Sequence, residues 1–299
     1  MWADFLFIQF PVAGIETFLF IPPAVAFGIS FFTSMAGISG AFLLMPFQVS
    51  VLGFISPSVT ATNFLYNVVG TPGGVIQYAR ESRVAWRLAL TMIAGALPGV
   101  LLGYYLRVIL LPDPRNFKLF VGVVLLIVAW RLVKDIYNHI RSQGLGEPET
   151  GLSCTGVEGS HAVQFAYRGH KFCFRIPAVM VPAFCVGVIG GTYGIGGGAL
   201  LAPFLVTVLH LPVHAIAEAV LTVNFIISLA GVTIYSLAPI SQGMTAPPDW
   251  LLGLLFGVGG LLGMNCGARF QKRFPATAIK LILASVICLV ALKYILQFL

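Results

Sequence analysis

The chain has 299 residues, of which 58% are hydrophobic and only 9% charged; this composition excludes an ordinary soluble protein and indicates an integral membrane protein. The net charge of +7 is local, because all 17 lysines and arginines lie within residues 80–175 and 269–299. This distribution predicts positively charged loops on one side of a bilayer and contacts with lipid headgroups, and it argues against nucleic acid binding.

Apolar segments follow one another along the chain in two sets of five. The N-terminal sequence MWADFLFIQF lacks the basic residues of a cleavable signal peptide. The segments lie near residues 17–35, 39–54, 59–78, 85–111 and 115–138, and then near 176–193, 197–210, 214–237, 249–270 and 276–298. A spanning helix needs about 20 apolar residues. We therefore predict an all-α polytopic membrane protein in the cell (inner) membrane, with a first transmembrane repeat at 1–138, a polar connecting loop at 139–175 and a second repeat at 176–299.

The two sets contain the same segment twice. Residues 37–78 and 194–235 align without a gap at an offset of 157, with 14 identities in 42 positions. Some identities are polar, such as Asn67 with Asn224, and these do not arise by chance between two apolar helices. Both copies open with a glycine-rich turn, GISG at 37–40 and GIGGG at 194–198, which we call the first and second glycine turns.

The orientation of the two repeats follows from their odd number of segments. Five segments per repeat place the second repeat upside down relative to the first. The loop near 79–87 carries Arg80, Arg83 and Arg87, whereas its counterpart near 237–248 has no basic residue, as inversion requires. If the short segments after the glycine turns are re-entrant instead of spanning, the number of spanning helices falls to eight. Inverted repeats with glycine-broken helices at the centre are the favoured prediction.

The polar segment 139–175 joins the two repeats. Its sequence HAVQFAYRGHKFCFR alternates apolar and polar residues around Arg168-Gly169-His170, which predicts a short β-hairpin. Cys154 and Cys173 share this segment, and they can pair only if it faces an oxidising compartment. No metal-binding spacing or enzyme motif is present, so neither a cofactor nor catalysis is expected.

Glycine ladders occur in both repeats. They comprise Gly95, Gly99 and Gly103 in the first and Gly259, Gly263 and Gly267 in the second. Glycine at every fourth position clears one helix face for close packing. These residues predict helix contacts and say little about a substrate.

The helices that start at the glycine turns are the best candidates for a binding site. A helix N-terminus leaves N–H groups unpaired and carries about half a positive charge, and glycine lets a ligand approach it. Two such ends directed at one point suit a small anion, held without a lysine or arginine because none lies near either turn in the sequence. The alternative is that the glycines only let helices cross. The candidate residues are Ser34, Gly37, Ser39, Gly40, Asn67, Tyr193, Gly194, Gly196, Gly197, Gly198 and Asn224, with Thr33 and Thr192 nearby.

Two kinds of polar residue extend this prediction. The matched pair Asn67 and Asn224 could each donate two hydrogen bonds to an oxyanion, or could equally hold helices together. Glu218 lies in the apolar sequence AIAEAVL, where a carboxyl group is a candidate for proton coupling. Its counterpart in the first repeat is Ala61, so Glu218 could instead only flank a helix end.

The glycine turns resemble those of the sulfite exporter TauE/SafE family, also called toluene-sulfonate uptake permeases. The resemblance rests on residues 37–40 through Pro46 and 194–198 through Pro203, and it extends over nearly all of the chain outside the 139–175 segment. It implies an inner-membrane permease for small sulfur-containing anions that does not hydrolyse ATP. The first turn departs from the pattern at Ser39 and Ala41, where the second has glycine, so the two repeats are expected to contribute unequally.

The predicted function is secondary transport of a small sulfur oxyanion, such as sulfite or an organosulfonate like sulfoacetate, by alternating access. The alternatives are a passive anion channel and a non-transporting membrane scaffold. Expected partners are the anion and the lipid bilayer. A homodimer stays an open alternative, because no feature of the sequence marks an interface.

Overall fold

The computed structural model describes residues 7–36, 38–72, 85–142, 162–167, 170–209, 213–238, 246–270 and 276–298. Gly37 and most of the loop with Arg80 and Arg83 lie outside this part of the chain. The described helices are α1 (Ile21–Ala36), α2 (Ala41–Ser50), α3 (Ser58–Gly70), α5 (Trp86–Tyr105), the π-helical η2 (Leu106–Leu110), α6 (Pro114–Ser142), α7 (Ile176–Tyr193), α8 (Gly198–Leu209), α9 (Val213–Leu237), α10 (Trp250–Phe270) and α11 (Ala276–Leu296). These bounds follow the predicted apolar segments closely.

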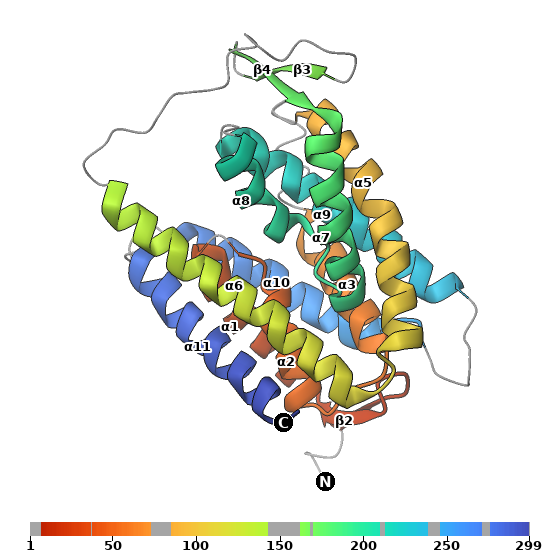
Figure 1. Cartoon of the computed structure of the whole chain (residues 1–299). Coiled ribbons are helices and arrows are strands. Elements are labelled where there is room, and N and C mark those ends of the chain that lie inside the picture. The colour runs from red at the N-terminus through yellow and green to blue at the C-terminus, as the bar shows by residue number, and fades with distance from the viewer. Residues whose placement is uncertain are drawn as a thin grey trace.

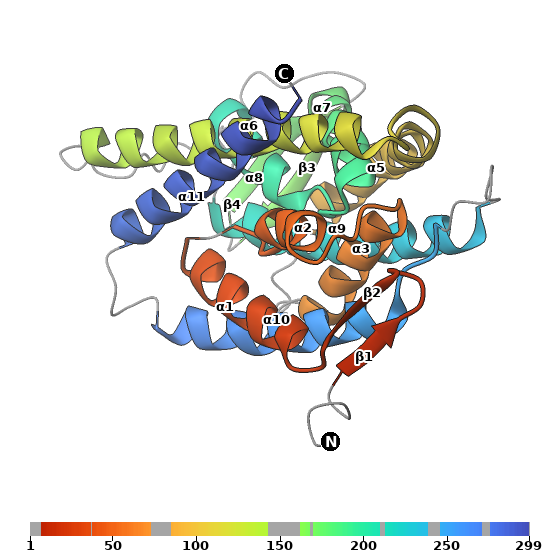
Figure 2. The same ribbon diagram turned by 90° about the horizontal axis from the view of Figure 1, so that it is seen from below.

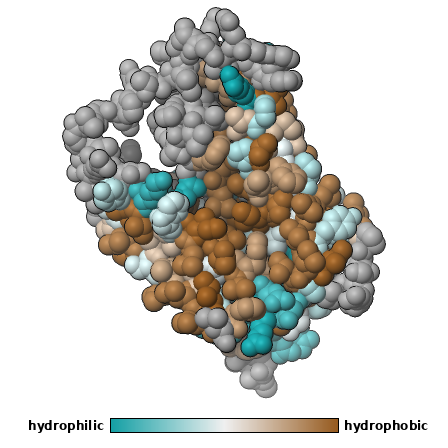
Figure 3. All heavy atoms as spheres, in the orientation of Figure 1, coloured by the Kyte–Doolittle hydropathy of each residue, from teal (hydrophilic) through white to brown (hydrophobic). Residues whose placement is uncertain are grey.

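The molecule is a multi-pass helical membrane protein. Within the described residues, five helical segments are long and apolar enough to cross a bilayer: Trp86–Leu110, Ile176–Tyr193, Glu218–Leu237, Trp250–Phe270 and Thr277–Leu296. Hydrophobic residues cover most of the described surface in Figure 3, and hydrophilic ones lie near its margins. This face, and the many large hydrophobic side chains exposed on the described helices, suit a lipid solvent.

The helices α2 and α8, which follow the glycine turns, are too short to span. They have 10 and 12 residues, or about 15 and 18 Å, whereas a bilayer core is about 30 Å thick. Pro46 lies inside α2 and is buried. Since irregular backbone beside a short helix cannot face lipid, both segments have to be covered by protein.

Helices distant in sequence pack in pairs (Figures 1 and 2). Helix α1 lies along α10, α5 lies along α7, and α6 lies along α11, while α3 contacts both α9 and α10. The glycine ladders lie in two of these contacts. A Cβ at Gly99 of α5 would overlap the carbonyl oxygen of Phe184 in α7, and one at Gly263 of α10 would overlap that of Phe27 in α1. The ladders thus bring helix backbones into direct contact, as predicted.

The end of α5 is fixed by a buried arginine. Arg107, in η2, donates hydrogen bonds to the carbonyl oxygens of Leu111 and Ile55, the latter at 2.9 Å. Its guanidinium carbon lies 3.7 Å from the centre of the Phe117 ring, a cation–π contact. A fully buried cation is tolerated here because carbonyl oxygens and an aromatic face replace water.

Two short hairpins accompany the helices. Strands β3 (Ala162–Tyr167) and β4 (His170–Arg175) pair antiparallel, where the alternating pattern predicted a hairpin. Cys173 on β4 is disulfide-bonded, which is a bond that an oxidising compartment preserves.

The N-terminal hairpin was not predicted. Strands β1 (Phe7–Phe10) and β2 (Ile15–Phe18) pair antiparallel, so the first apolar segment, expected from residue 17, becomes helical only at Ile21. The buried Asp249 anchors this hairpin, since its carboxylate accepts hydrogen bonds from the backbone N–H of Ala13 at 3.2 Å and of Leu252 at 3.1 Å. The same aspartate therefore caps α10 and holds the hairpin loop.

Candidate functional site

The two glycine turns meet at α3, where Asn67 contacts both of them. The Asn67 Oδ1 accepts a hydrogen bond from the Ser39 hydroxyl of the first turn at 3.5 Å. Its Nδ2 donates to the carbonyl oxygen of Gly194 in the second turn at 3.3 Å. Asn67 is 2% exposed, so these two long bonds form out of contact with solvent. One buried amide thus joins two turns that are 157 residues apart in sequence.

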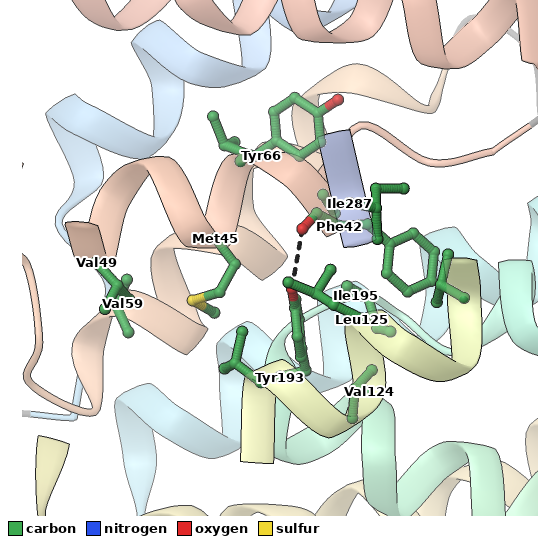
Figure 4. Close-up of a cluster of buried hydrophobic side chains, with 14 of the residues drawn as sticks. Phe42, Met45, Val49, Val59, Tyr66, Val124, Leu125, Tyr193, Ile195 and Ile287 are labelled. Carbon is green, nitrogen blue, oxygen red and sulfur yellow. Dashed lines mark hydrogen bonds between the residues drawn. The ribbon is translucent and has the colours of Figure 1, made fainter. Parts of the chain in front are cut away.

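Further hydrogen bonds connect the surroundings of the two turns. The Tyr193 hydroxyl, just before the second turn, donates to the carbonyl oxygen of Phe42 in α2 at 2.9 Å (Figure 4). The Thr60 hydroxyl of α3 donates to the carbonyl oxygen of Thr192 at 3.1 Å. Tyr193 lies in a cluster of buried side chains from α2, α3 and α6. The packing around it therefore fixes the position of one turn relative to the other.

Side chains fill the space around the first turn. A Cβ at Gly40 would overlap the Tyr66 hydroxyl and lie 3.0 Å from the Ser30 Oγ. The Ser39 hydroxyl accepts a hydrogen bond from the Ala41 N–H at 3.3 Å, which pairs one of the free N–H groups at the start of α2. Asn63 Nδ2 donates to the Ala41 carbonyl oxygen at 3.2 Å. The polar groups of the first glycine turn are thus largely bonded to the protein itself.

The second turn is built from backbone. Gly194, Gly196 and Gly197 have φ angles of 83°, 68° and 78°, in the left-handed region that favours glycine. A Cβ at Gly194 would overlap the carbonyl oxygen of Thr60, so this turn also presses against α3. A Cβ at Gly198, the first residue of α8, would lie 2.7 Å from the Val220 carbonyl oxygen of α9. Glycine is therefore required both for the turn and for its contacts.

Two polar atoms of α9 face the second turn without a partner. A Cβ at Gly196 would overlap the Asn224 Oδ1 and lie 2.7 Å from the Ser228 Oγ. Asn224 is 6% exposed and Ser228 is fully buried, and neither of these two oxygen atoms has a hydrogen-bond partner within the described chain. Such atoms are costly in a protein interior unless something binds them.

A cation approaches α8, contrary to the expectation that neither turn has an arginine near it. Arg131 of α6 donates from Nη1 to the carbonyl oxygen of Leu200 at 3.1 Å, within the first turn of α8. Its Nη2 is buried and has no partner among the described residues. The sequence placed Arg131 on another apolar segment, and only the packing of α6 brings it to α8.

The remaining candidates lie in different places. Ser34 faces α10, because its Oγ would overlap a Cβ at Gly267, and its hydroxyl bonds to the Phe31 carbonyl oxygen at 3.0 Å. Thr33 bonds to the carbonyl oxygen of Ile29 at 2.9 Å, within its own helix. Glu218 is buried in α9 at the start of an apolar span, and its role stays a prediction.

Sequence reasoning missed Ser228, Asn63 and Arg131. Ser228 and Asn63 differ from the residues at the 157-residue offset, Thr71 and Val220, so the search for identities passed over them. Arg131 carried a usable signal, because an arginine within an apolar segment is a candidate functional residue.

Comparisons with known proteins show the family of this chain. The family model described as Sulfite exporter TauE/SafE matches residues 23–294. A probable membrane transporter protein of Bacillus subtilis (strain 168), YunE, is 22% identical over 269 residues, which cover 88% of this chain and 92% of that protein. A probable membrane transporter protein of Xylella fastidiosa (strain 9a5c) is 22% identical over 251 residues, covering 83% of each chain. No solved structure matches. With both glycine turns inside the matched region, the chain belongs to the sulfite exporter TauE/SafE family.

Proposed function

We propose that this membrane transporter is a secondary carrier of a small sulfur oxyanion, such as sulfite or an organosulfonate like sulfoacetate. It works in the cell (inner) membrane by alternating access between two related halves. The name of its family and the transporter names of its relatives support this proposal.

The observation that carries the proposal is the meeting of the two glycine turns at Asn67. Each turn precedes a short helix, α2 or α8, whose N-terminus supplies about half a positive charge. The amide of Asn67 bonds to Ser39 in one turn and to Gly194 in the other. Two partly positive helix ends beside one buried amide favour a small anion over a cation or a neutral solute.

The helix pairs support two related halves. By their order within the two sets of five segments, α1 corresponds to α7 and α5 corresponds to α10. The contact of α1 with α10 is therefore equivalent to the contact of α7 with α5, with the two halves exchanged. The pairs α3 with α9 and α6 with α11 join corresponding helices. This pattern is expected for inverted repeats around a pseudo-two-fold axis, the architecture of many alternating-access carriers.

Counterflow in proteoliposomes tests the proposal. Vesicles loaded with unlabelled sulfite should accumulate external labelled sulfite transiently, because a carrier returns faster when it is loaded. Flux without this trans-stimulation would mean a channel. If none of sulfite, methanesulfonate and sulfoacetate moves into vesicles that contain the folded protein, it is not an oxyanion transporter.

A further inference from the structure

The two corresponding asparagines differ in how their amides are bonded. Both ends of the Asn67 amide are bonded, because its Oδ1 accepts from Ser39 and its Nδ2 donates to Gly194. One turn further along α3, the Thr71 hydroxyl donates to the Asn67 carbonyl oxygen at 2.7 Å. The polar groups around Asn67 are therefore already paired within the protein.

Around Asn224 the equivalent bonds are missing. At the 157-residue offset, Ser39 is replaced by Gly196, which has no hydroxyl to donate to the Asn224 Oδ1. Thr71 is replaced by Ser228, whose Oγ has no partner among the described residues although it is fully buried. Both unpaired oxygens lie against Gly196, two residues before α8 begins. The second half of the site thus has unused hydrogen-bonding capacity at a helix N-terminus.

The groups gathered there can all donate hydrogen bonds. The Ser228 hydroxyl is a donor, and a half-turn of the Asn224 amide presents its NH2 group in place of its oxygen. The first turn of α8 adds backbone N–H groups that no side chain at position 196 can cap, since that residue is glycine. Donors of this kind match the oxygen atoms of a sulfonate or sulfite group.

Among the described residues, no lysine or arginine bonds to the Asn224 Oδ1 or the Ser228 Oγ. Arg131, whose Nη2 is unpaired, donates from Nη1 to the Leu200 carbonyl oxygen, and the negative charge of Asp135, one helical turn along α6, partly balances its own. Arg107 is bonded to the carbonyl oxygens of Ile55 and Leu111. The cost of taking an ion out of water rises with the square of its charge, about four-fold from a monoanion to a dianion. Neutral donors and one helix N-terminus can offset the desolvation cost of a monoanion better than that of a dianion.

We infer that the second glycine turn, together with Asn224 and Ser228, binds the anion, and that it selects a head group with a single negative charge, such as a sulfonate or hydrogen sulfite. This inference rests on the proposed function and adds a binding residue, Ser228, and a rule of charge selection. Asn67 and the first turn form the structural half of the site.

A matched pair of ligands tests the rule of charge. Methanesulfonate and sulfate are similar in size and shape, but methanesulfonate carries one charge and sulfate carries two. Ligand-induced thermal stabilisation of the detergent-solubilised protein, followed against ligand concentration, gives an apparent Kd for each. We expect methanesulfonate to bind at least about ten-fold more tightly than sulfate. Sulfite should bind more tightly as acidification converts it to hydrogen sulfite, while methanesulfonate binding stays constant. Equal affinities for methanesulfonate and sulfate, or sulfite binding that does not change with pH, would overturn the inference.

A matched pair of variants tests the residue. Ser228→Ala removes the unpaired hydroxyl, and we expect the Kd for methanesulfonate to rise about ten-fold, as for the loss of one hydrogen bond to a charged group. Ser236→Ala makes the same change two turns further along α9, where the hydroxyl bonds to the Val232 carbonyl oxygen at 2.7 Å, and should leave Kd unchanged. Equal effects of the two substitutions would refute the assignment of Ser228.

The two proposals fail in different ways. If the vesicles transport no oxyanion, the proposed function is wrong. If they transport sulfate and methanesulfonate equally well, the proposed carrier function stands and only the rule of charge selection is wrong. Because the comparison of ligands uses the unmodified protein, it decides the inference even if the Ser228 variant does not fold.

Discussion

Replacing Gly99 by alanine tests whether backbone contact between α5 and α7 stabilises the protein. The added Cβ would overlap the carbonyl oxygen of Phe184 and would lie 2.9 Å from the backbone nitrogen of Val188. Both atoms belong to the backbone of α7, so they cannot rotate away as a side chain could. The two helices would have to separate locally, and overpacking of this kind costs about 1–3 kcal/mol.

Gly28→Ala in α1 is the matched control, because no heavy atom other than the adjacent backbone of its own helix lies within 4 Å of the Cβ position there. This substitution should be neutral or stabilising by up to about 1 kcal/mol, since alanine is the better helix former. Thermal unfolding of the two purified variants, measured in the same detergent, should therefore differ by several degrees, with Gly99→Ala the less stable. If Gly99→Ala unfolds at the temperature of the unmodified protein or above it, the glycine ladder is not a tight contact and the argument fails.

Four other substitutions test the asparagines, the buried glutamate and the anchor of the N-terminal hairpin. Asn67→Ala should lower both, because Gly194 loses its hydrogen bond, whereas Asn224→Ala should lower anion uptake with little change in the melting temperature. Unaltered uptake by both variants would exclude the asparagines from the site. Glu218→Gln should flatten the pH dependence of uptake if this carboxyl group couples transport to protons; an unchanged pH profile in vesicles would remove that role. Asp249→Ala should speed amide hydrogen exchange in the 7–18 hairpin, measured by mass spectrometry. Exchange in α6 should not change and serves as the reference.

The helices were predictable from sequence because their ends coincide with breaks in apolar character. Helix α7, for example, ends where Gly194 takes up a left-handed conformation, and glycine at that position is visible in the sequence. The N-terminal hairpin was missed because its strands have only four residues each and β2 ends three residues before α1 begins. Segments this short do not distinguish a strand from the start of a helix.

The candidate site was predictable in part. The offset of 157 identified Asn67 and Asn224, and the sequence left a ligand-binding and a helix-bridging role open for each. Their different hydrogen bonds depend on Ser39 and Gly196, where the two copies differ. The approach of Arg131 to Leu200 depends on the packing of α6, which no local pattern encodes. Identities between the copies mark the candidate site, and differences between them underlie the separate roles that we propose for its two halves.

The exchange of partners between the halves has a consequence for biogenesis. Helix α1 leaves the ribosome more than 200 residues before α10, the helix whose glycine ladder packs against it. During synthesis, the first half therefore waits in the bilayer with the faces of α1 and α5 uncovered, and quality-control proteases could attack it there. Residues 1–142 expressed alone should be degraded rapidly, and co-expression with residues 143–299 should rescue them, because neither polypeptide can complete its folding without the other.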